Sequence, residues 1–322
     1  MPIHRLKALV SDDFEAMNDV IVSMIQAQIG LIDDLANHII QSGGKRLRPL
    51  IVLLASRACN YLGRQHITLA AMIEFFHTAT LLHDDVVDDS TLRRGKETAN
   101  SIWGSKASIL VGDYFFTLYL QLMLQVGDMN IMHLLADITH QITCGEIKQL
   151  SNRHNYDLAI QDYFDVIRSK TSLLFAASST MGALISQSSK TIEHGLYAYG
   201  LHLGNAFQLI DDALDYCSDA KTIGKNIGDD LAEGKATMPL LYVLQHGTSE
   251  QKHIIRQSLE TSNIDDLPTI LSIIAETDAI NYTRQIAAAE VEQAIAALDV
   301  LPESIYKNAL KEIASYAVTR DH

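Results

Sequence analysis

Two apolar, helix-like stretches of this chain end in the same acidic pattern, Asp-Asp-x-x-Asp, and this repeat limits the folds open to it. The first pattern runs from Asp84 through Asp85 to Asp88, and the second runs from Asp211 to Asp215. On a helix, residues four apart share a face, so the carboxylates of each pattern repel one another. They also lie at the C-terminal end, where the helix dipole is already negative. Such an arrangement makes sense if a cation binds there, and carboxylate oxygens suit Mg²⁺.

A single acidic helix end is more often a solvated surface feature than a metal site. Two such ends, each on an apolar helix, reverse that preference. The offset from Asp84 to Asp211 is 127 residues, far beyond the roughly 20–50 residues of a solenoid repeat. We therefore interpret them as two helices of one domain that carry candidate metal ligands at Asp84, Asp85, Asp88, Asp211 and Asp215.

Composition favours an all-α fold. Hydrophobic residues make up 48% of the 322 residues and only five residues are proline, while helix formers dominate and no alternating β-pattern stands out. The chain is long enough for a deep core. With no convincing linker, we predict a single domain over residues 1–322, built as one large helical bundle. Its helices are expected near residues 13–40, 49–61, 68–88, 108–124, 131–150, 157–187 and 193–216, with further amphipathic helices from 240 to 322.

Charge and targeting signals exclude some classes of protein. With 39 acidic and 25 basic residues, the net charge of −14 argues against a nucleic-acid partner. The three cysteines are widely scattered without a CxxC pair, which fits a reducing compartment. The N-terminus lacks the apolar region of a signal peptide, and no run reaches the ~18 apolar residues that span a bilayer. We expect a soluble, cytoplasmic protein, and peripheral membrane contact stays open.

A basic cluster follows two glycines in Gly-Gly-Lys-Arg-Leu-Arg-Pro, residues 43–49. One interpretation is a helix end whose cations neutralise the dipole. The other is an anion site, because glycine lets the backbone approach closely and Lys45 and Arg48 supply donors suited to phosphate. The cluster alone does not decide between the two.

Further basic residues follow both acidic patterns. Arg93 and Arg94 come directly after the first, where they either balance surface charge or clamp an anion held by metal ions. Lys225 and Lys235 lie among glycines in the long polar loop after the second, as a flexible cover for phosphate requires. His77 lies seven positions before the first pattern, on the same helix face. A lone histidine there is usually a core residue, but its alignment with the carboxylates favours a functional role.

Together, two acidic helix ends, basic clusters and an otherwise apolar lining fit a diphosphate carried on a hydrocarbon. Six motifs of the chain resemble those of the trans-isoprenyl diphosphate synthase family. They are Gly-Gly-Lys-Arg-Leu-Arg-Pro, His77, the first Asp-Asp-x-x-Asp with Arg93-Arg94, Lys170-Thr171, Gln208 and the second Asp-Asp-x-x-Asp. Their order and spacing match over nearly the whole chain. This resemblance implies an isoprenoid synthase type I fold, a helical bundle around a deep central cavity.

The resemblance also implies head-to-tail elongation of an allylic diphosphate such as farnesyl diphosphate by isopentenyl diphosphate. Three Mg²⁺ ions on Asp84, Asp88 and Asp211 would bind the allylic diphosphate. Thr171 and Gln208 would stabilise the carbocation through their dipoles. The allylic diphosphate would further contact Arg93, Lys170, Lys225 and Lys235, and isopentenyl diphosphate would contact Lys45, Arg48, His77 and Arg94. A homodimer is implied as well.

Within the family, the chain is similar to the long-chain bacterial type, because its first motif has the two-residue gap Val86-Val87. A product near eight isoprene units, for a quinone side chain, is expected. Three alternatives remain: a shorter-chain synthase such as a geranylgeranyl type, a class I terpene cyclase, and a non-catalytic helical partner subunit. A cyclase would not need the second diphosphate site, and a partner subunit would be expected to lose the second acidic motif.

Product length is expected to depend on the helix face before the first motif. Ala79 and Thr80, one turn before Asp84, are small and would leave a path for a growing hydrocarbon. Larger apolar residues must then close the cavity. The candidates are Phe76, Leu120 and Met123, and for the last two an ordinary core role is equally compatible with the sequence.

Overall fold

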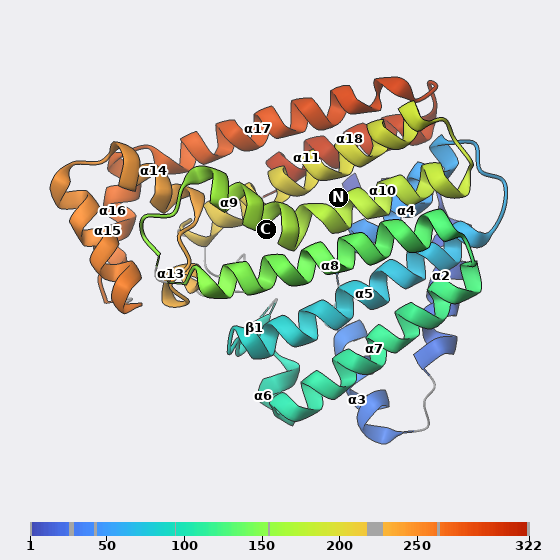
Figure 1. Cartoon of the computed structure of the whole chain (residues 1–322), viewed down its shortest axis with the longest axis horizontal. Helices are drawn as coiled ribbons and strands as arrows, with labels where there is room; N and C mark the ends of the chain where they lie inside the picture. Colours follow the sequence, from blue (N-terminus) through green and yellow to red (C-terminus); the bar gives the residue numbers. More distant parts are fainter. Residues whose placement is uncertain are drawn as a thin grey trace. The chain divides into compact units, whose positions relative to one another are not determined.

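The computed structural model describes residues 2–25, 29–41, 44–93, 95–153, 155–217, 228–262 and 265–320. Within these residues the regular structure is helical, apart from one short antiparallel hairpin that pairs β1 (Leu92–Arg93) with β2 (Lys96–Glu97) (Figure 1). The predicted all-α class is confirmed.

The contacts divide the chain into two compact units. Unit 1 comprises Met1–Ala136, Ala177–Tyr197 and Leu298–Ile313, and unit 2 comprises Asp137–Ala176, Ala198–Ala297 and Ala314–His322. Each unit contains one of the two acidic patterns, and we describe each unit by itself.

The core of unit 1 is built on two helices that are apolar on nearly every side, as buried helices are. The stretch 50–56 of α4 is fully buried, and α5 buries Phe75 and Phe76. Helix α7 lies beside α5 (Figure 1), where the rings of Phe76 and Tyr119 have centroids 5.1 Å apart. The helices up to residue 151 are α1 (Pro2–Ala8), α2 (Ser11–Ile25), α3 (Gly30–Gln41), α4 (Leu47–Ala58), α5 (Gln65–Val87), α6 (Ala99–Trp103), α7 (Ser105–Val126) and α8 (Met129–Ser151).

The prediction of one helix over residues 13–40 is wrong. This region forms two helices, α2 and α3, and α2 already begins at Ser11 with Asp12 and Asp13 in its first turn. The apolar pattern continues through both helices and so hides the break before Gly30. The preceding short helix α1 was not predicted either, because seven residues carry too little periodicity to reveal it.

The expectation that no segment is apolar enough to span a membrane is also wrong. By length and composition, α7 qualifies, with 22 residues and a window of mean hydropathy 1.4, of which 39% is buried. Lys106 and Asp113 interrupt the apolar run, so a count of consecutive apolar residues overlooks it. A buried core helix passes the same test, so this property by itself is weak evidence for a membrane segment.

Unit 2 holds a helical cluster at its C-terminal part, where α14, α15, α16 and the start of α17 enclose Leu240, Val243, Ile255, Leu259 and Ile270 (Figure 1). The predicted break at residues 246–248 is confirmed, since α14 ends at His246 and Thr248 caps α15. The later helices are α9 (Ile160–Ile167), α10 (Leu173–Ile185), α11 (Lys190–Asp215), α13 (Asp229–Ala232), α14 (Met238–His246), α15 (Ser249–Thr261), α16 (Leu267–Glu276), α17 (Ala279–Ala297) and α18 (Ile305–Thr319), with a 3₁₀ turn η2 (Leu298–Val300).

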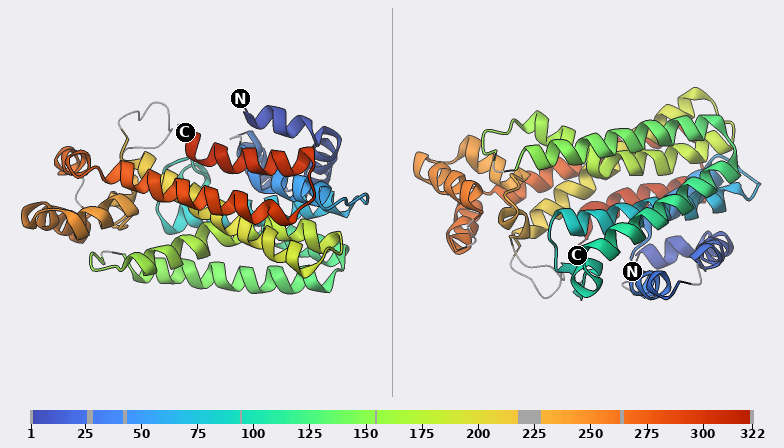
Figure 2. Two further views of the ribbon diagram at one scale, coloured as in Figure 1. Left: turned by 90° about the horizontal axis from the view of Figure 1, so that it is seen from above. Right: turned by 60° about the horizontal axis from the view of Figure 1, so that its bottom comes forward.

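Helix α17 runs beside the C-terminal half of α11 (Figure 2), and polar contacts join the two. His202 Nδ1 lies 2.7 Å from a carboxylate oxygen of Glu290, and Asn205 donates to the same oxygen at 3.0 Å. This pairing holds the helix that carries the second acidic pattern.

The predicted continuous helix over residues 157–187 is interrupted. After α9 the chain makes a π-turn, η1 (Arg168–Ser172), before α10 begins. Single π-turns inside α-helices are rare, and those that occur are often found at functional sites. Gly204 of α11 packs directly on this turn, since a Cβ atom there would lie 2.3 Å from the Cα of Ser172. Only glycine permits this close approach.

Candidate active site

The first acidic pattern ends α5 in unit 1. Asp84 and Asp88 lie in and just after its last turn and are both half-buried, as a metal-binding face requires. Asp85 differs from its prediction as a ligand. Its carboxylate is buried, accepts a hydrogen bond from Arg93 Nε at 2.8 Å and forms an ion pair with an Nη of Arg93 at 2.7 Å. Asp85 thus holds Arg93, which the β1–β2 hairpin carries back toward the end of α5.

The predicted isopentenyl-diphosphate residues of unit 1 are brought together in part. An Nη of Arg48, in the first turn of α4, lies 3.2 Å from Nε2 of His77 on α5. Nε2 is therefore the acceptor in this contact, since a guanidinium only donates. Lys45 lies just before α4 and is half-buried. Arg94 lies outside the described residues.

Neighbouring Arg46 has a different role. It adopts a left-handed backbone conformation (φ 49°) at the start of α4, and its Nε lies 3.5 Å from Glu74. Its guanidinium also donates to Asn18 of α2. Arg46 thus connects the start of α4 to both α5 and α2.

The residues proposed to limit product length lie on α5 and α7. Ala79 is 1% exposed and Phe76 is buried, whereas Thr80 is half-buried and donates to the backbone oxygen of His77. Opposite Phe76 the structure places the ring of Tyr119. Leu120 does not occupy that position, because 37% of its surface is exposed. Met123, one turn further along α7, is half-buried.

In unit 2, the π-turn carries Lys170 and Thr171. Lys170 Nζ is held by two side chains of α8, Glu146 at 3.2 Å and Gln149 at 3.0 Å. The Thr171 hydroxyl donates to Gln208 Oε1 on α11 at 2.8 Å. The predicted set Lys170, Thr171 and Gln208 is therefore assembled on adjacent elements of one unit.

The second acidic pattern ends α11. Asp211 accepts a hydrogen bond at 2.6 Å from Arg320, whose guanidinium also donates to the Phe207 carbonyl and lies 3.6 Å above the Phe207 ring. Asp215 accepts from the backbone N–H of Asp230 at 3.3 Å, at the start of the short helix α13. Both carboxylates thus have polar contacts from segments distant in sequence.

Asp212, between these two residues, is buried. Its pKa is raised to about 7, mainly by burial and further by the nearby charge of Asp230, against the lowering effect of hydrogen bonds from Tyr163, Gln208 and the N–H of Met238. The pKa of Tyr163 is raised well above its ordinary value, first by burial and then by the charge of Asp212. Both groups of this pair are strongly perturbed, and perturbed pairs of this kind cluster at functional sites.

A pocket of about 70 Å³ joins these groups. Gln149, Lys170, Gln208, Asp212 and Lys235 all contribute to its wall. Lys235 is held by an ion pair with Glu233, and only 13% of its side chain is exposed. Lys225, the other predicted lysine, lies outside the described residues. The pocket therefore combines cationic side chains with amides and carboxyl groups, a lining that suits an anion.

The donor chemistry of both patterns fits Mg²⁺ supplied together with phosphate. Among the described residues, no group of three or more His, Cys, Asp or Glu side chains could hold a metal ion by itself. Mg²⁺ does not need such a cage, because it is usually bound by one or two carboxylates together with substrate phosphates and water. Asp84 with Asp88 in unit 1, and Asp211 with Asp215 in unit 2, match that pattern.

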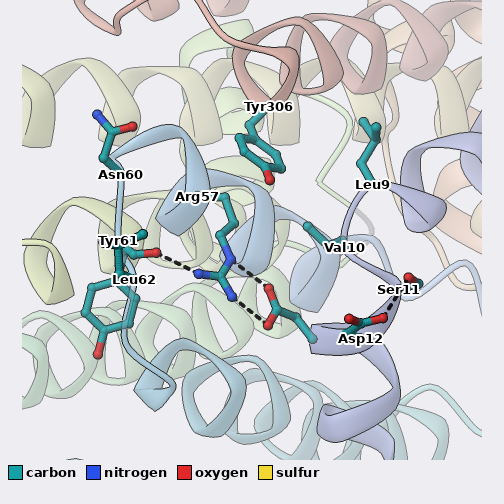
Figure 3. Close-up of a pocket in the computed structure, with 10 residues that line it drawn as sticks. Leu9, Val10, Ser11, Asp12, Arg57, Asn60, Tyr61, Leu62 and Tyr306 are labelled. Atoms are coloured by element: carbon teal, nitrogen blue, oxygen red, sulfur yellow. Dashed lines mark hydrogen bonds and ion pairs between the residues drawn. The ribbon is translucent and has the colours of Figure 1, made fainter.

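A second pocket, of about 360 Å³, contains none of the predicted site residues (Figure 3). Arg57 lines it and donates twice to Asp13, at 2.8 and 2.7 Å, and once to the Tyr61 carbonyl. Fully buried His66 lies 3.0 Å from the same carboxylate. Burial would raise the pKa of Asp13, but the hydrogen bonds from Arg57 and His66 leave it lowered.

His66 lies at the opposite end of α5 from Asp84, about 27 Å along the helix. The pocket beside it is thus remote from the first acidic pattern, and we interpret the Arg57–Asp13–His66 cluster as a structural ion network.

Five residues of the site in unit 2 are not among the site residues predicted from the sequence. Glu146 and Gln149 could have been found, because their spacing of three places them on one helix face. Asp212 belongs to the recognised motif, but it differs from Asp211 and Asp215 only in being buried, which the sequence does not show. Tyr163 and Arg320 carry no sequence signal, since their partners lie 49 and 109 positions away.

These geometries describe a helical protein with acidic helix ends and a cation-lined pocket, and comparison with known proteins places it in a family. The family model described as polyprenyl synthetase matches residues 29–274. The chain belongs to the polyprenyl synthetase family.

Individual relatives extend over the whole chain. It is 43% identical to the octaprenyl diphosphate synthase of Escherichia coli over 322 residues, which cover 100% of both chains. It is 40% identical to the octaprenyl diphosphate synthase of Haemophilus influenzae, covering 100% of this chain and 98% of the relative. Among solved structures, a polyprenyl synthase from Caulobacter crescentus complexed with calcium and isoprenyl diphosphate matches with a TM-score of 0.96 and 39% identity, covering 99% and 98% of the two chains. The resemblance inferred from the motifs is confirmed.

Proposed function

We propose that this protein is a magnesium-dependent trans-prenyltransferase that condenses isopentenyl diphosphate with an allylic diphosphate and makes a long-chain, octaprenyl diphosphate. The observation that carries this proposal is the convergence of Lys170, Thr171, Gln208 and Lys235 with the second acidic pattern in unit 2. The full-length similarity to octaprenyl diphosphate synthases supports the substrate class and the product.

In unit 2, each side chain has a defined task. Lys170 and Lys235 supply positive charge for an allylic diphosphate, and their carboxylate partners hold them in the pocket wall. Charge grows on the diphosphate as its bond to the allyl group breaks, so fixed cations stabilise the transition state more than the ground state. The oxygens of Thr171 and Gln208 suit the carbocation because neither is nucleophilic enough to trap it.

In unit 1, the pair Arg48 and His77, together with Lys45, would hold the diphosphate of isopentenyl diphosphate. Arg48 offers the planar fork that phosphate prefers. Arg93 is held by Asp85, so its guanidinium is presented by the hairpin in a fixed position for the allylic diphosphate. Arg94 and Lys225 stay in this proposal on the motif pattern alone.

Three Mg²⁺ ions are proposed, held by Asp84 and Asp88 in unit 1 and by Asp211 and Asp215 in unit 2. When bound, they would neutralise the diphosphate and help it to leave. Asp85 is omitted because its side chain is only 6% exposed and pairs with Arg93, whereas Asp211, which also pairs with an arginine, is 43% exposed. The calcium in the Caulobacter crescentus structure supports a divalent ion in this family.

A single assay tests the function. Purified protein is incubated with Mg²⁺, farnesyl diphosphate and labelled isopentenyl diphosphate, and product length is measured. A product near eight isoprene units supports the proposal, and a product of four units would instead identify a shorter-chain synthase. Absence of elongation, with farnesyl diphosphate left intact, would refute it, and a cyclised hydrocarbon would indicate a cyclase.

We further propose that the two units act as one polyprenyl synthetase domain, because the family match runs through residues of both. A homodimer is proposed from the exposed apolar side chains of α7, of which Leu110 and Leu124 are 67% and 68% exposed. Sedimentation should show twice the monomer mass, and Leu110→Glu with Leu124→Glu should reduce it to the monomer. A monomer in the unmodified protein would refute the dimer.

A cytoplasmic location is proposed as well, supported by three free cysteines in the described structure. Contact with a membrane at product release is proposed because a forty-carbon product partitions into lipid. Cell fractionation and vesicle flotation with and without product test these two points. Recovery of the protein in a periplasmic or secreted fraction would refute the location.

A further inference from the structure

Asp212 belongs to the second acidic pattern but is not exposed as a metal ligand would be. It is 2% exposed, whereas 43% of the Asp211 side chain is exposed. Its Oδ1 accepts from Gln208 Nε2 at 2.9 Å. Its Oδ2 accepts from the Tyr163 hydroxyl at 2.5 Å and from the N–H of Met238 at 3.4 Å. A metal ion would have to displace these donors.

These hydrogen bonds determine which way round the Gln208 amide lies. Gln208 Nε2 is the donor to Asp212 Oδ1, so the half of the amide that faces Asp212 is the NH₂ group. The amide oxygen then faces Thr171 and accepts from its hydroxyl at 2.8 Å. Because threonine has a single hydroxyl proton, this bond leaves only lone pairs on the Thr171 oxygen for any further group.

We infer that Asp212, held by Tyr163, is a positioning residue that sets the dipole direction of Gln208 and Thr171, so that oxygen lone pairs are offered to the carbocation of prenyl transfer. The inference rests on the proposed function. With the amide reversed, its NH₂ would face Thr171. The Thr171 hydroxyl would then lose its acceptor, and its O–H would be free to point toward the substrate. The positive ends of both dipoles would then be available to a growing positive charge. Preorganised dipoles of the correct sign are usually the largest single contribution to catalysis.

The substitution Asp212→Asn tests this directly, because asparagine has nearly the same shape yet offers both a donor and an acceptor to Gln208. Two quantities are measured: kcat, and the Mg²⁺-dependent binding of the non-reactive thiodiphosphate analogue of farnesyl diphosphate by calorimetry. We expect kcat to fall by roughly ten- to a hundredfold. Binding of the analogue should stay within about twofold, since the interaction acts only in the transition state.

The matched control is Asp215→Asn, the same change three positions later on a proposed metal ligand. It should weaken Mg²⁺-dependent binding of the analogue. If Asp212→Asn weakens that binding to the same extent, Asp212 is a metal ligand and the inference is wrong.

A double-mutant cycle separates positioning from an independent effect. In a Thr171→Val background, the main group on which the orientation acts is absent, so Asp212→Asn should lower kcat by less than about threefold further. If Asp212→Asn lowers kcat by the same factor in the Thr171→Val background as in the natural background, the inference is wrong.

Folding is monitored by thermal unfolding of each variant. If Asp212→Asn unfolds below the assay temperature, Tyr163→Phe replaces it, since that change removes one O–H donor and keeps the ring. It should lower kcat in the natural background and have little further effect with Thr171→Val. A protein without any prenyl transfer would refute the proposed function instead, and the binding comparison would still decide whether Asp212 acts as a ligand.

Discussion

Replacing Gly204 by alanine should separate α11 from the π-turn by a distance that the structure defines. The added Cβ would lie 2.3 Å from the Cα and 2.7 Å from the Cβ of Ser172, whereas ordinary contact begins at 3.4 Å. Both partners are anchored helical segments, so the elements must move about 1 Å apart. Overpacking of this kind costs about 1–3 kcal/mol, partly offset by about 1 kcal/mol from the better helix propensity of alanine.

The larger consequence is for catalysis. The same separation would stretch the 2.8 Å hydrogen bond between Thr171 and Gln208 toward 3.8 Å, beyond hydrogen-bond range. A misplacement of about 1 Å can cost a hundredfold in rate. We therefore expect Gly204→Ala to lower kcat by roughly ten- to a hundredfold while the unfolding temperature falls by only a few degrees.

The assay compares product formation and thermal unfolding for Gly204→Ala and Gly30→Ala. The control position has no atom within 4 Å of its added Cβ, so its kcat should be unchanged, and its unfolding temperature should hold or rise slightly with the better helix propensity of alanine. A Gly204→Ala enzyme with kcat within about twofold of the natural protein would refute the reasoning, because the turn would then tolerate the displacement.

Four further substitutions test the remaining assignments. Arg48→Ala should raise KM for isopentenyl diphosphate by roughly ten- to a hundredfold, more than KM for the allylic substrate, because a charge-assisted contact to phosphate is lost. Asp84→Ala should abolish elongation, while the metal-free unfolding temperature holds or rises since repulsion at the end of α5 is relieved. Ala79→Tyr should shorten the product to about three or four isoprene units, because the new ring lies about 7.5 Å along α5 from Asp84. Asp13→Asn should lower the free energy of unfolding at pH 7 by about 1.5–3 kcal/mol, because it removes charge-assisted hydrogen bonds from the part-buried Arg57.

The last of these predictions also has a pH dependence. The pKa of Asp13 is lowered in the folded protein, so its stabilisation is present above its unfolded pKa of about 3.9 and is lost as pH falls through the folded value. The difference in unfolding free energy between the natural protein and the variant should therefore shrink as pH falls below about 4. The Arg48 assignment would be contradicted if only KM for the allylic substrate rose, and the Asp84 assignment by near-normal turnover in Asp84→Ala. An unchanged product length in Ala79→Tyr would contradict the chain-length assignment. For Asp13→Asn, the contradicting result is a difference in unfolding free energy that does not change with pH.

The sequence predicted the helices that carry the acidic patterns well. For α5 and α11, an apolar stretch ends in aspartates, and the observed ends at Val87 and Asp215 lie within one residue of the predicted ones. Arg48 and His77 were also expected to share a ligand, and they lie in contact. Local patterns succeed here because apolar periodicity and functional charge coincide.

Prediction failed where the decisive contact is tertiary. The η1 turn interrupts a stretch whose composition suits a continuous helix, and the Gly204 contact that accompanies it comes from another helix. Leu120 was placed at the cavity floor by its apolar character, but helix rotation exposes it and turns Tyr119 inward. The contact of Arg320 with Asp211 joins positions far apart, and no pattern within either segment announces it.

The π-turn at η1 (Arg168–Ser172) gives this segment an unusual sensitivity to insertion and deletion. A π-turn holds one residue more than an α-turn, so it behaves as a single inserted residue inside a long helix. Loss of one codon anywhere within these five would restore a regular helix. Because the π-turn takes up its extra residue locally, α10 would keep its face relative to α9. Lys170 and Thr171 lie in the turn, so their side chains would instead shift away from their partners on α8 and α11, although almost every amino acid were still present. In this stretch, the number of residues determines the local structure as much as their identity does.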